Sequence, residues 1–118
     1  LLDVVDVKPL PLALVDLAHD HGKPVAITET GAFYVPGGGG AKESKIKRAW
    51  WRQAFAPDLL TELPRVKMVS WFEWVKNEPE VDATVDWSVT GTPAMAKAFA
   101  ADLPDWVVPA AGGPVCSP

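Results

Sequence analysis

The sequence contains a single cysteine, no excess of positive charge and no long hydrophobic run, and each of these shortages excludes a class of protein. Cys116 alone excludes an intrachain disulfide and a cysteine-rich metal site. The net charge of −4 and the pI of about 5.0 do not indicate a nucleic-acid-binding surface. No run approaches the roughly 18 consecutive apolar residues of a membrane-spanning helix. We therefore expect neither nucleic acid nor a membrane as a partner.

The sequence shows no signal-peptide pattern at its start, and it begins at Leu1 within an apolar stretch. We therefore expect that an N-terminal portion of the protein is absent from this sequence. Processing of a longer precursor is the alternative. Without a targeting segment, the sequence alone does not define a compartment.

The most informative segment is residues 23–31, Lys-Pro-Val-Ala-Ile-Thr-Glu-Thr-Gly. Its apolar run from Val25 to Ile27 is typical of a strand buried in a parallel sheet. Glu29 follows at the carboxyl end of that predicted strand, which is where α/β barrels carry their catalytic groups. Gly31 permits a backbone turn that a larger residue would resist. The alternative role for Glu29 is that of a buried or ion-paired structural carboxylate.

Strand and helix patterns alternate along the chain. Apolar and β-branched runs predict strands at residues 2–7, 24–29 and 66–74. Helical spacing predicts helices at residues 12–21, 43–55 and 94–103. Such an order predicts parallel βα units. Three units cannot close an eight-stranded barrel, which needs about 250 residues, so the chain is either a small open α/β domain or the last part of a barrel.

The connections between these elements carry their own signals. Gly22 is expected to end the first helix as a C-cap, and Thr92 followed by Pro93 is expected to begin the last one. We expect a polar loop at residues 76–85 and a loosely ordered tail at residues 104–118, which are rich in Pro, Gly and Ala.

Three stretches of the chain together carry a resemblance to a known family. They are residues 22–31, the Trp50-Trp51 pair with Gln53, and residues 64–72 followed by Lys76 and the Asp86-Trp87 pair. They resemble glycoside hydrolase family 26, the β-mannanase-like enzymes that fold as (β/α)8 barrels with a retaining mechanism. The resemblance covers roughly residues 1–103 and implies the last three βα units of such a barrel, followed by the tail.

The resemblance implies a function for the full-length protein, namely hydrolysis of a β-linked polysaccharide such as mannan. Glu29 matches the nucleophile of the family, which ends strand 7. A retaining mechanism needs a second carboxyl group about 5–5.5 Å away, and the family carries it on strand 4, which this chain does not contain. The fragment alone is therefore expected to be inactive. The resemblance implies no cofactor and no metal, a polysaccharide or oligosaccharide as partner, and a secreted protein.

Two tryptophans are candidates for substrate binding, because the apolar face of a sugar stacks on indole. Trp71 matches an aromatic residue that lines the subsite of the cleaved sugar, with core packing as its alternative. Trp74 either lines the cleft or closes the top of the barrel. Core packing is the expected role of Trp50 and Trp51. Glu73 shares a predicted strand face with Trp71, but the resemblance implies that it is a rim residue and not the acid/base.

Several charged residues are expected to be structural. Asp86 is interpreted as a loop cap. A basic cluster is predicted to form a solvated helix face; its members are Lys42, Lys45, Lys47 and Arg48.

Two other functions stay open at this point. One is a non-catalytic carbohydrate-binding protein or a degenerate barrel remnant, since a fold alone does not determine activity. The other is a small open α/β domain of unrelated function. A glutamate at the end of a fourth strand, upstream of Leu1, would favour the enzyme.

Overall fold

The structure is a computed structural model that describes residues 12–110, and it confirms the predicted α/β class. Its elements, in chain order, are α1 (Leu12–Asp20), β1 (Val25–Thr30), α2 (Glu43–Ala54), α3 (Leu59–Glu62), β2 (Val66–Trp71), β3 (Val75–Glu78), the 3₁₀ turn η1 (Pro79–Val81), β4 (Ala83–Asp86) and α4 (Pro93–Asp102). The strand expected at residues 2–7 lies outside the described residues.

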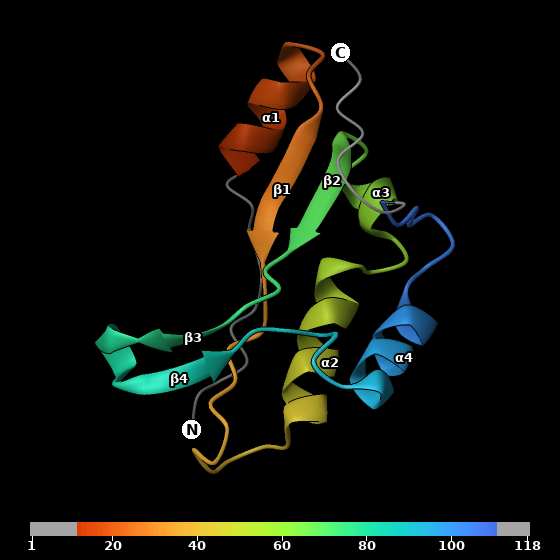
Figure 1. Cartoon of the computed structure of the whole chain (residues 1–118). Helices are drawn as coiled ribbons and strands as arrows, with labels where there is room; N and C mark the ends of the chain where they lie inside the picture. Colours follow the sequence, from red (N-terminus) through yellow and green to blue (C-terminus); the bar gives the residue numbers. More distant parts are fainter. Residues whose placement is uncertain (1–11, 111–118) are drawn as a thin grey trace, which may run out of the picture.

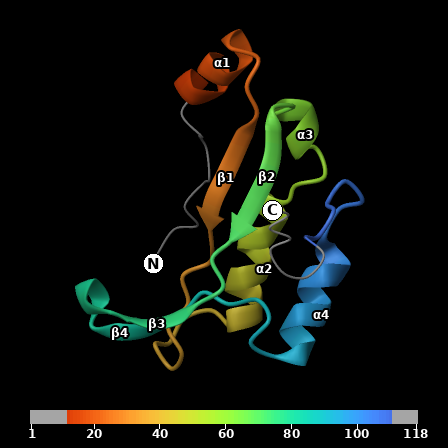
Figure 2. The ribbon, with the colours of Figure 1, turned by 45° about the horizontal axis from the view of Figure 1, so that its top comes forward.

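The strands β1 and β2 form a parallel pair, as βα units require. Val25 lies opposite Val66 at one end of the pair, and Thr30 lies opposite Trp71 at the other. Both strands therefore finish at the same end of the sheet (Figures 1 and 2). Within residues 12–110 each sheet has two strands, and these residues close no barrel.

One apolar cluster covers a face of this parallel pair. Ala18 of α1 packs with Val25 and Val66, and residues of the strands and of the α3 region complete the cluster: Ile27, Val69, Leu59, Leu60 and Leu63. The neighbouring cross-strand pair Ala26–Met68 is exposed, with 49% of Met68 accessible. A parallel sheet is normally covered on both faces, so residues 12–110 leave part of this one uncovered.

A second cluster joins α2 to α4, which lie side by side (Figures 1 and 2). Trp51 and Phe55 come from the end of α2, and Phe99 of α4 makes edge-on contacts with both rings. Trp106 and Val107 also pack against this cluster. The beginning of the expected tail is therefore part of the core, and residues 111–118 lie outside the described part.

The prediction of a polar loop at residues 76–85 is wrong. β3 and β4 instead form an antiparallel hairpin in which Val75 lies opposite Asp86 and Glu78 lies opposite Ala83. The turn between them is η1, after which Asp82 adopts the left-handed conformation at φ 47°. This hairpin projects beyond the carboxyl ends of β1 and β2 (Figure 1).

The predicted helix ends are confirmed. Gly22 follows α1 with a φ of +62°, a conformation that glycine adopts at no steric cost. The Thr92 hydroxyl accepts a hydrogen bond from the backbone N–H of Met95 at 3.2 Å, which satisfies one of the free donors in the first turn of α4.

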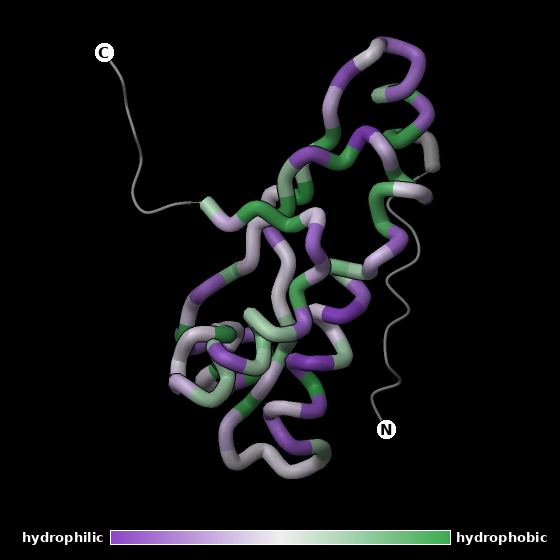
Figure 3. Tube along the Cα trace, turned by 90° about the vertical axis from the view of Figure 1, so that its right-hand side faces the viewer, coloured by the Kyte–Doolittle hydropathy of each residue, from purple (hydrophilic) through white to green (hydrophobic). Residues whose placement is uncertain are grey.

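None of the helices in residues 12–110 is long and apolar enough to cross a membrane. Hydrophobic stretches along the trace are short and alternate with hydrophilic ones (Figure 3).

Candidate active site

The candidate site lies where the carboxyl ends of β1 and β2 meet. The Phe72 N–H donates a hydrogen bond of 2.7 Å to the Thr30 carbonyl oxygen, which continues the parallel pairing past the end of β2. Glu29 immediately precedes Thr30, and Trp71 lies opposite Thr30. The structure therefore brings these two predicted site residues, Glu29 and Trp71, to the same edge of the sheet.

Glu29 is exposed although it belongs to a strand. The register of β1 against β2 shifts between Ile27 and Thr30, so the regular alternation of faces is interrupted at Glu29. Among residues 12–110 its carboxylate takes part in no ion pair. Next to it, the Thr30 hydroxyl accepts a hydrogen bond of 2.9 Å from the Trp50 indole. The strand end is thus fixed to α2 while the carboxylate stays accessible.

The expectation that a residue larger than glycine would resist the backbone turn at position 31 is wrong. Gly31 does not have a positive φ. A Cβ at this position would lie 3.4 Å from the Phe72 Cβ and 3.5 Å from a ring carbon of Trp87, which are ordinary contact distances. Gly31 is therefore a position of close packing between the chain after β1 and two aromatic residues.

Trp71 is half-buried and contributes to the core. Its ring centroid lies 5.8 Å from that of Phe99 on α4. Its indole N–H donates a hydrogen bond of 2.8 Å to the Trp87 carbonyl oxygen. The core packing considered for Trp71 is therefore present, and only part of the ring is accessible.

Trp74 differs from Trp71 because 59% of it is exposed. One side of its ring stacks on Phe72, with the ring centroids 6.3 Å apart and the planes inclined by 23°. The Lys76 ammonium lies 5.7 Å from the centroid of the Phe72 ring. Trp74 thus presents an indole supported from one side and open to solvent.

Two further aromatic residues, Phe33 and Trp87, support this stack. The Trp87 ring makes edge-on contacts with Phe33 and Phe72, at centroid separations of 5.3 Å and 5.9 Å. We call Phe33, Phe72, Trp74 and Trp87 the aromatic platform. Its members come from the segments that follow β1, β2 and β4.

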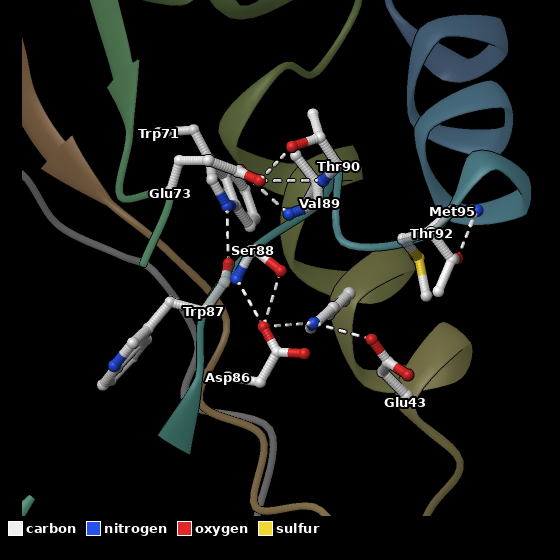
Figure 4. A network of polar contacts seen from close by, with 11 residues as sticks. Glu43, Trp71, Glu73, Asp86, Trp87, Ser88, Val89, Thr90, Thr92 and Met95 are labelled. Atoms are coloured by element: carbon white, nitrogen blue, oxygen red, sulfur yellow. Dashed lines mark hydrogen bonds and ion pairs between the residues drawn. The ribbon is translucent and has the colours of Figure 1, made fainter. Parts of the chain in front are cut away.

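Glu73 is exposed and lies in the segment that follows β2. Its carboxylate accepts hydrogen bonds from the backbone N–H groups of Val89 and Thr90, at 2.9 Å each, and from the Thr90 hydroxyl (Figure 4). The strand β2 ends at Trp71 instead of continuing to Trp74, so Glu73 lies beyond the strand. With its oxygens engaged in this way, Glu73 is a poor candidate for an acid/base.

The solvated position predicted for Lys47 is wrong, because its side chain is completely buried. The ammonium lies 2.7 Å from Glu43 Oε1 and 3.2 Å from Asp86 Oδ1. It also lies over the Tyr34 ring, 5.5 Å from the centroid. The signal that sequence reasoning missed is the spacing of Lys47, which shares a helix face with buried Trp51 one turn later.

The predicted loop cap at Asp86 is confirmed. Asp86 Oδ1 accepts hydrogen bonds from the Ser88 N–H at 2.8 Å and from the Ser88 hydroxyl at 2.7 Å (Figure 4). Burial raises the pKa of the Asp86 carboxyl, but the bonds from Ser88 and Lys47 outweigh burial and lower the pKa below its ordinary value.

Residues 12–110 contain no group of three or more His, Cys, Asp or Glu side chains placed to hold a metal ion. Comparison of the chain with protein-family profiles, curated proteins and solved structures finds no match.

Proposed function

We propose that the chain is the C-terminal part of a (β/α)8 retaining glycoside hydrolase similar to family 26, acting on a β-linked polysaccharide with mannan as the first candidate. The observation that carries this proposal is the position of Glu29. It is an exposed carboxylate at the carboxyl end of a parallel strand, beside a second strand end that carries Trp71. Catalytic groups of α/β barrels occupy this position.

Glu29 would act as the nucleophile. Its ionised carboxylate attacks the anomeric carbon and forms a glycosyl ester as the bond to the leaving sugar oxygen breaks, and water then releases the sugar. The hydrogen bond from Trp50 to Thr30 supports this role, because a nucleophile needs a rigid mount. The acid/base carboxyl group would come from a part of the protein outside this chain.

The aromatic platform would bind the substrate. The open face of Trp74 offers a rigid apolar surface for a pyranose ring, and Phe72 supports it from behind. Trp71 has less accessible surface, so its contribution to binding would come from the exposed part of its ring.

A non-catalytic carbohydrate-binding protein is the second candidate function. The exposure of Trp74 favours it, because stacking on this indole needs no acid/base residue. The two functions differ in one observable: a binding protein retains manno-oligosaccharides without cleaving them.

The decisive experiment replaces Glu29 in the full-length protein. Glu29→Ala should remove nearly all hydrolysis without changing the thermal unfolding midpoint, because the carboxylate lies exposed. Added azide should restore turnover of an activated glycoside, since a small anion fits the vacated space and attacks the anomeric carbon. The rescued product should have inverted configuration, because one displacement replaces two.

Glu62→Ala is the matched control, because Glu62 is an exposed glutamate on α3, ahead of the amino end of β2. It should retain full activity. Full hydrolysis by Glu29→Ala would contradict the nucleophile assignment. Binding of manno-oligosaccharide by a wild-type protein that never cleaves it would support the second function instead.

A further inference from the structure

The backbone of Trp87 makes one hydrogen bond to each of the two candidate substrate-binding tryptophans, Trp71 and Trp74. Its carbonyl oxygen accepts the hydrogen bond from the Trp71 indole at 2.8 Å. Its N–H donates a hydrogen bond of 2.9 Å to the carbonyl oxygen of Trp74. The placement of the two indoles therefore depends on where the backbone at position 87 lies.

The turn at residues 86–90 is held at its start by Asp86 and at its end by Glu73, which accepts hydrogen bonds from the N–H groups of Val89 and Thr90. The Asp86 N–H donates a hydrogen bond of 2.8 Å to the Tyr34 carbonyl oxygen. Its Oδ1 accepts hydrogen bonds from the Ser88 N–H and the Ser88 hydroxyl (Figure 4). The Lys47 ammonium lies 3.2 Å from the same oxygen. Of these contacts, only the one from Lys47 connects the turn to a helix, because Lys47 belongs to α2.

A fully buried ammonium restricts geometry more than an apolar side chain would. Removing a charge from water is costly unless it is paired and hydrogen-bonded, and Lys47 meets this need with Glu43, Asp86 and the Tyr34 ring. Apolar residues of similar volume often give equal stability at such places. The distinctive effect of Lys47 is thus to hold Asp86 at a set distance from α2.

We propose that Lys47 is a positioning residue for saccharide binding: through Asp86 it fixes the Trp87 backbone, and with it Trp71 and Trp74. This inference rests on the proposed function for its ligand. The series of contacts that links Lys47 to the two indoles through Asp86 and Trp87 does not depend on that function and is tested separately.

The neighbouring residue, Arg48, provides a matched control. It also belongs to α2 and also pairs with a carboxylate, but its partner is Asp102 of α4, at 2.7 Å. Loss of Arg48 therefore removes a cation and an ion pair from the same helix without touching the turn at 86–90.

The test compares Lys47→Met with Arg48→Met in the full-length protein, with ¹⁵N-labelled tryptophan and indole resonances assigned by Trp→Phe variants. In Lys47→Met, the Trp71 indole N–H should exchange with solvent at least about tenfold faster, because its acceptor is no longer held in place. The Trp51 indole N–H, which donates to Asp102 at 2.9 Å, should keep its protection. Arg48→Met should leave the Trp71 resonance unchanged.

Affinity for a manno-oligosaccharide, measured by calorimetry, should fall about tenfold or more in Lys47→Met and stay unchanged in Arg48→Met. Unchanged Trp71 exchange in a folded Lys47→Met would overturn the inference, as would equal loss of protection at Trp71 and Trp51. If Lys47→Met does not fold, Asp86→Asn decides by the same criteria, because it removes the ion pair and leaves an acceptor for Ser88. Failure of both variants to fold would also overturn the inference, since Lys47 would then support the whole chain.

The two proposals fail in different ways. A wild-type protein without affinity for any manno-oligosaccharide would contradict the proposed function, while the exchange data would still decide whether Lys47 positions Trp71.

Discussion

At the scale of single residues, Trp71 and Trp74 show how one side-chain type takes two roles within one segment. Trp71 is half-buried against Phe99 and has its indole N–H paired. Trp74 is 59% exposed, and only one side of its ring is covered by Phe72. We therefore expect removal of Trp71 to lower stability, whereas removal of Trp74 tests the proposed binding role separately from stability.

Trp74→Ala should weaken manno-oligosaccharide binding in the full-length protein and change the free energy of unfolding by less than about 0.5 kcal/mol, as expected for an exposed position. Trp71→Ala should lower the free energy of unfolding by more than about 2 kcal/mol, because it leaves a cavity beside Phe99. Urea unfolding and calorimetric titration measure the two effects. Unchanged affinity in Trp74→Ala would remove the platform from the proposed function.

The sequence predicts the position of Glu29 correctly and that of Lys47 wrongly, because only the first depends on local sequence. The position of Glu29 follows from a local signal, an apolar run that ends in a carboxylate, and the structure has it at the end of β1. The burial of Lys47 depends on Asp86, which lies far along the chain. A lysine among other basic residues is usually solvated, so only the tertiary contact reveals the exception.

At the scale of elements, the bounds predicted for α1, α2 and α4 agree with the structure to within one residue, whereas the hairpin was not predicted. Helix ends carry local chemistry, such as Gly22 after α1 and the Thr92 cap of α4. The strands β3 and β4 have four residues each, with mostly exposed side chains in β3, so no apolar alternation marks them. These two strands are regular because they pair with each other.

One carboxylate connects α2 to α4. Asp102 accepts hydrogen bonds from Arg48 at 2.7 Å, Arg52 at 3.0 Å and the Trp51 indole at 2.9 Å. Hydrogen bonds from Arg48, Arg52 and then Trp51 hold the pKa of the Asp102 carboxyl well below its usual range. The two helices are therefore joined more firmly when this group is ionised.

This connection predicts a specific dependence on pH. Because the Asp102 pKa is lowered by folding, its contribution is fully present above the unfolded-state pKa of about 3.9 and is lost as the pH falls from there toward the folded-state value. The difference in free energy of unfolding between wild type and Asp102→Asn should be constant from pH 7 to about pH 5 and should shrink below about pH 4. Urea unfolding at each pH measures it. A difference that does not change with pH would show that the carboxylate charge is not what joins the helices.

At the scale of the whole molecule, the described residues leave surface that a complete barrel would cover. The strands β1 and β2 have only each other as partners within residues 12–110. Leu14 and Leu17 on α1 are 46% and 54% exposed, and Met68 on β2 is 49% exposed. Unpaired strand edges and exposed apolar side chains promote association with other chains.

The 118-residue chain alone should therefore be inactive on mannan, should melt without a sharp transition and should self-associate. Mannan hydrolysis, differential scanning calorimetry and analytical ultracentrifugation measure the three properties. A sharp melt of a monomer with substantial turnover would contradict the proposal that the chain is part of a barrel, and would favour a complete small α/β enzyme.

The hydrogen bond between the Trp87 N–H and the Trp74 carbonyl oxygen has a consequence for protein engineering. Because main-chain atoms make this bond, it does not depend on which side chain stands at position 74. Residue 74 can therefore be varied in a library without releasing the hairpin that follows it. Exchanging the indole for smaller or polar groups would alter ligand preference while the surrounding scaffold stays in place.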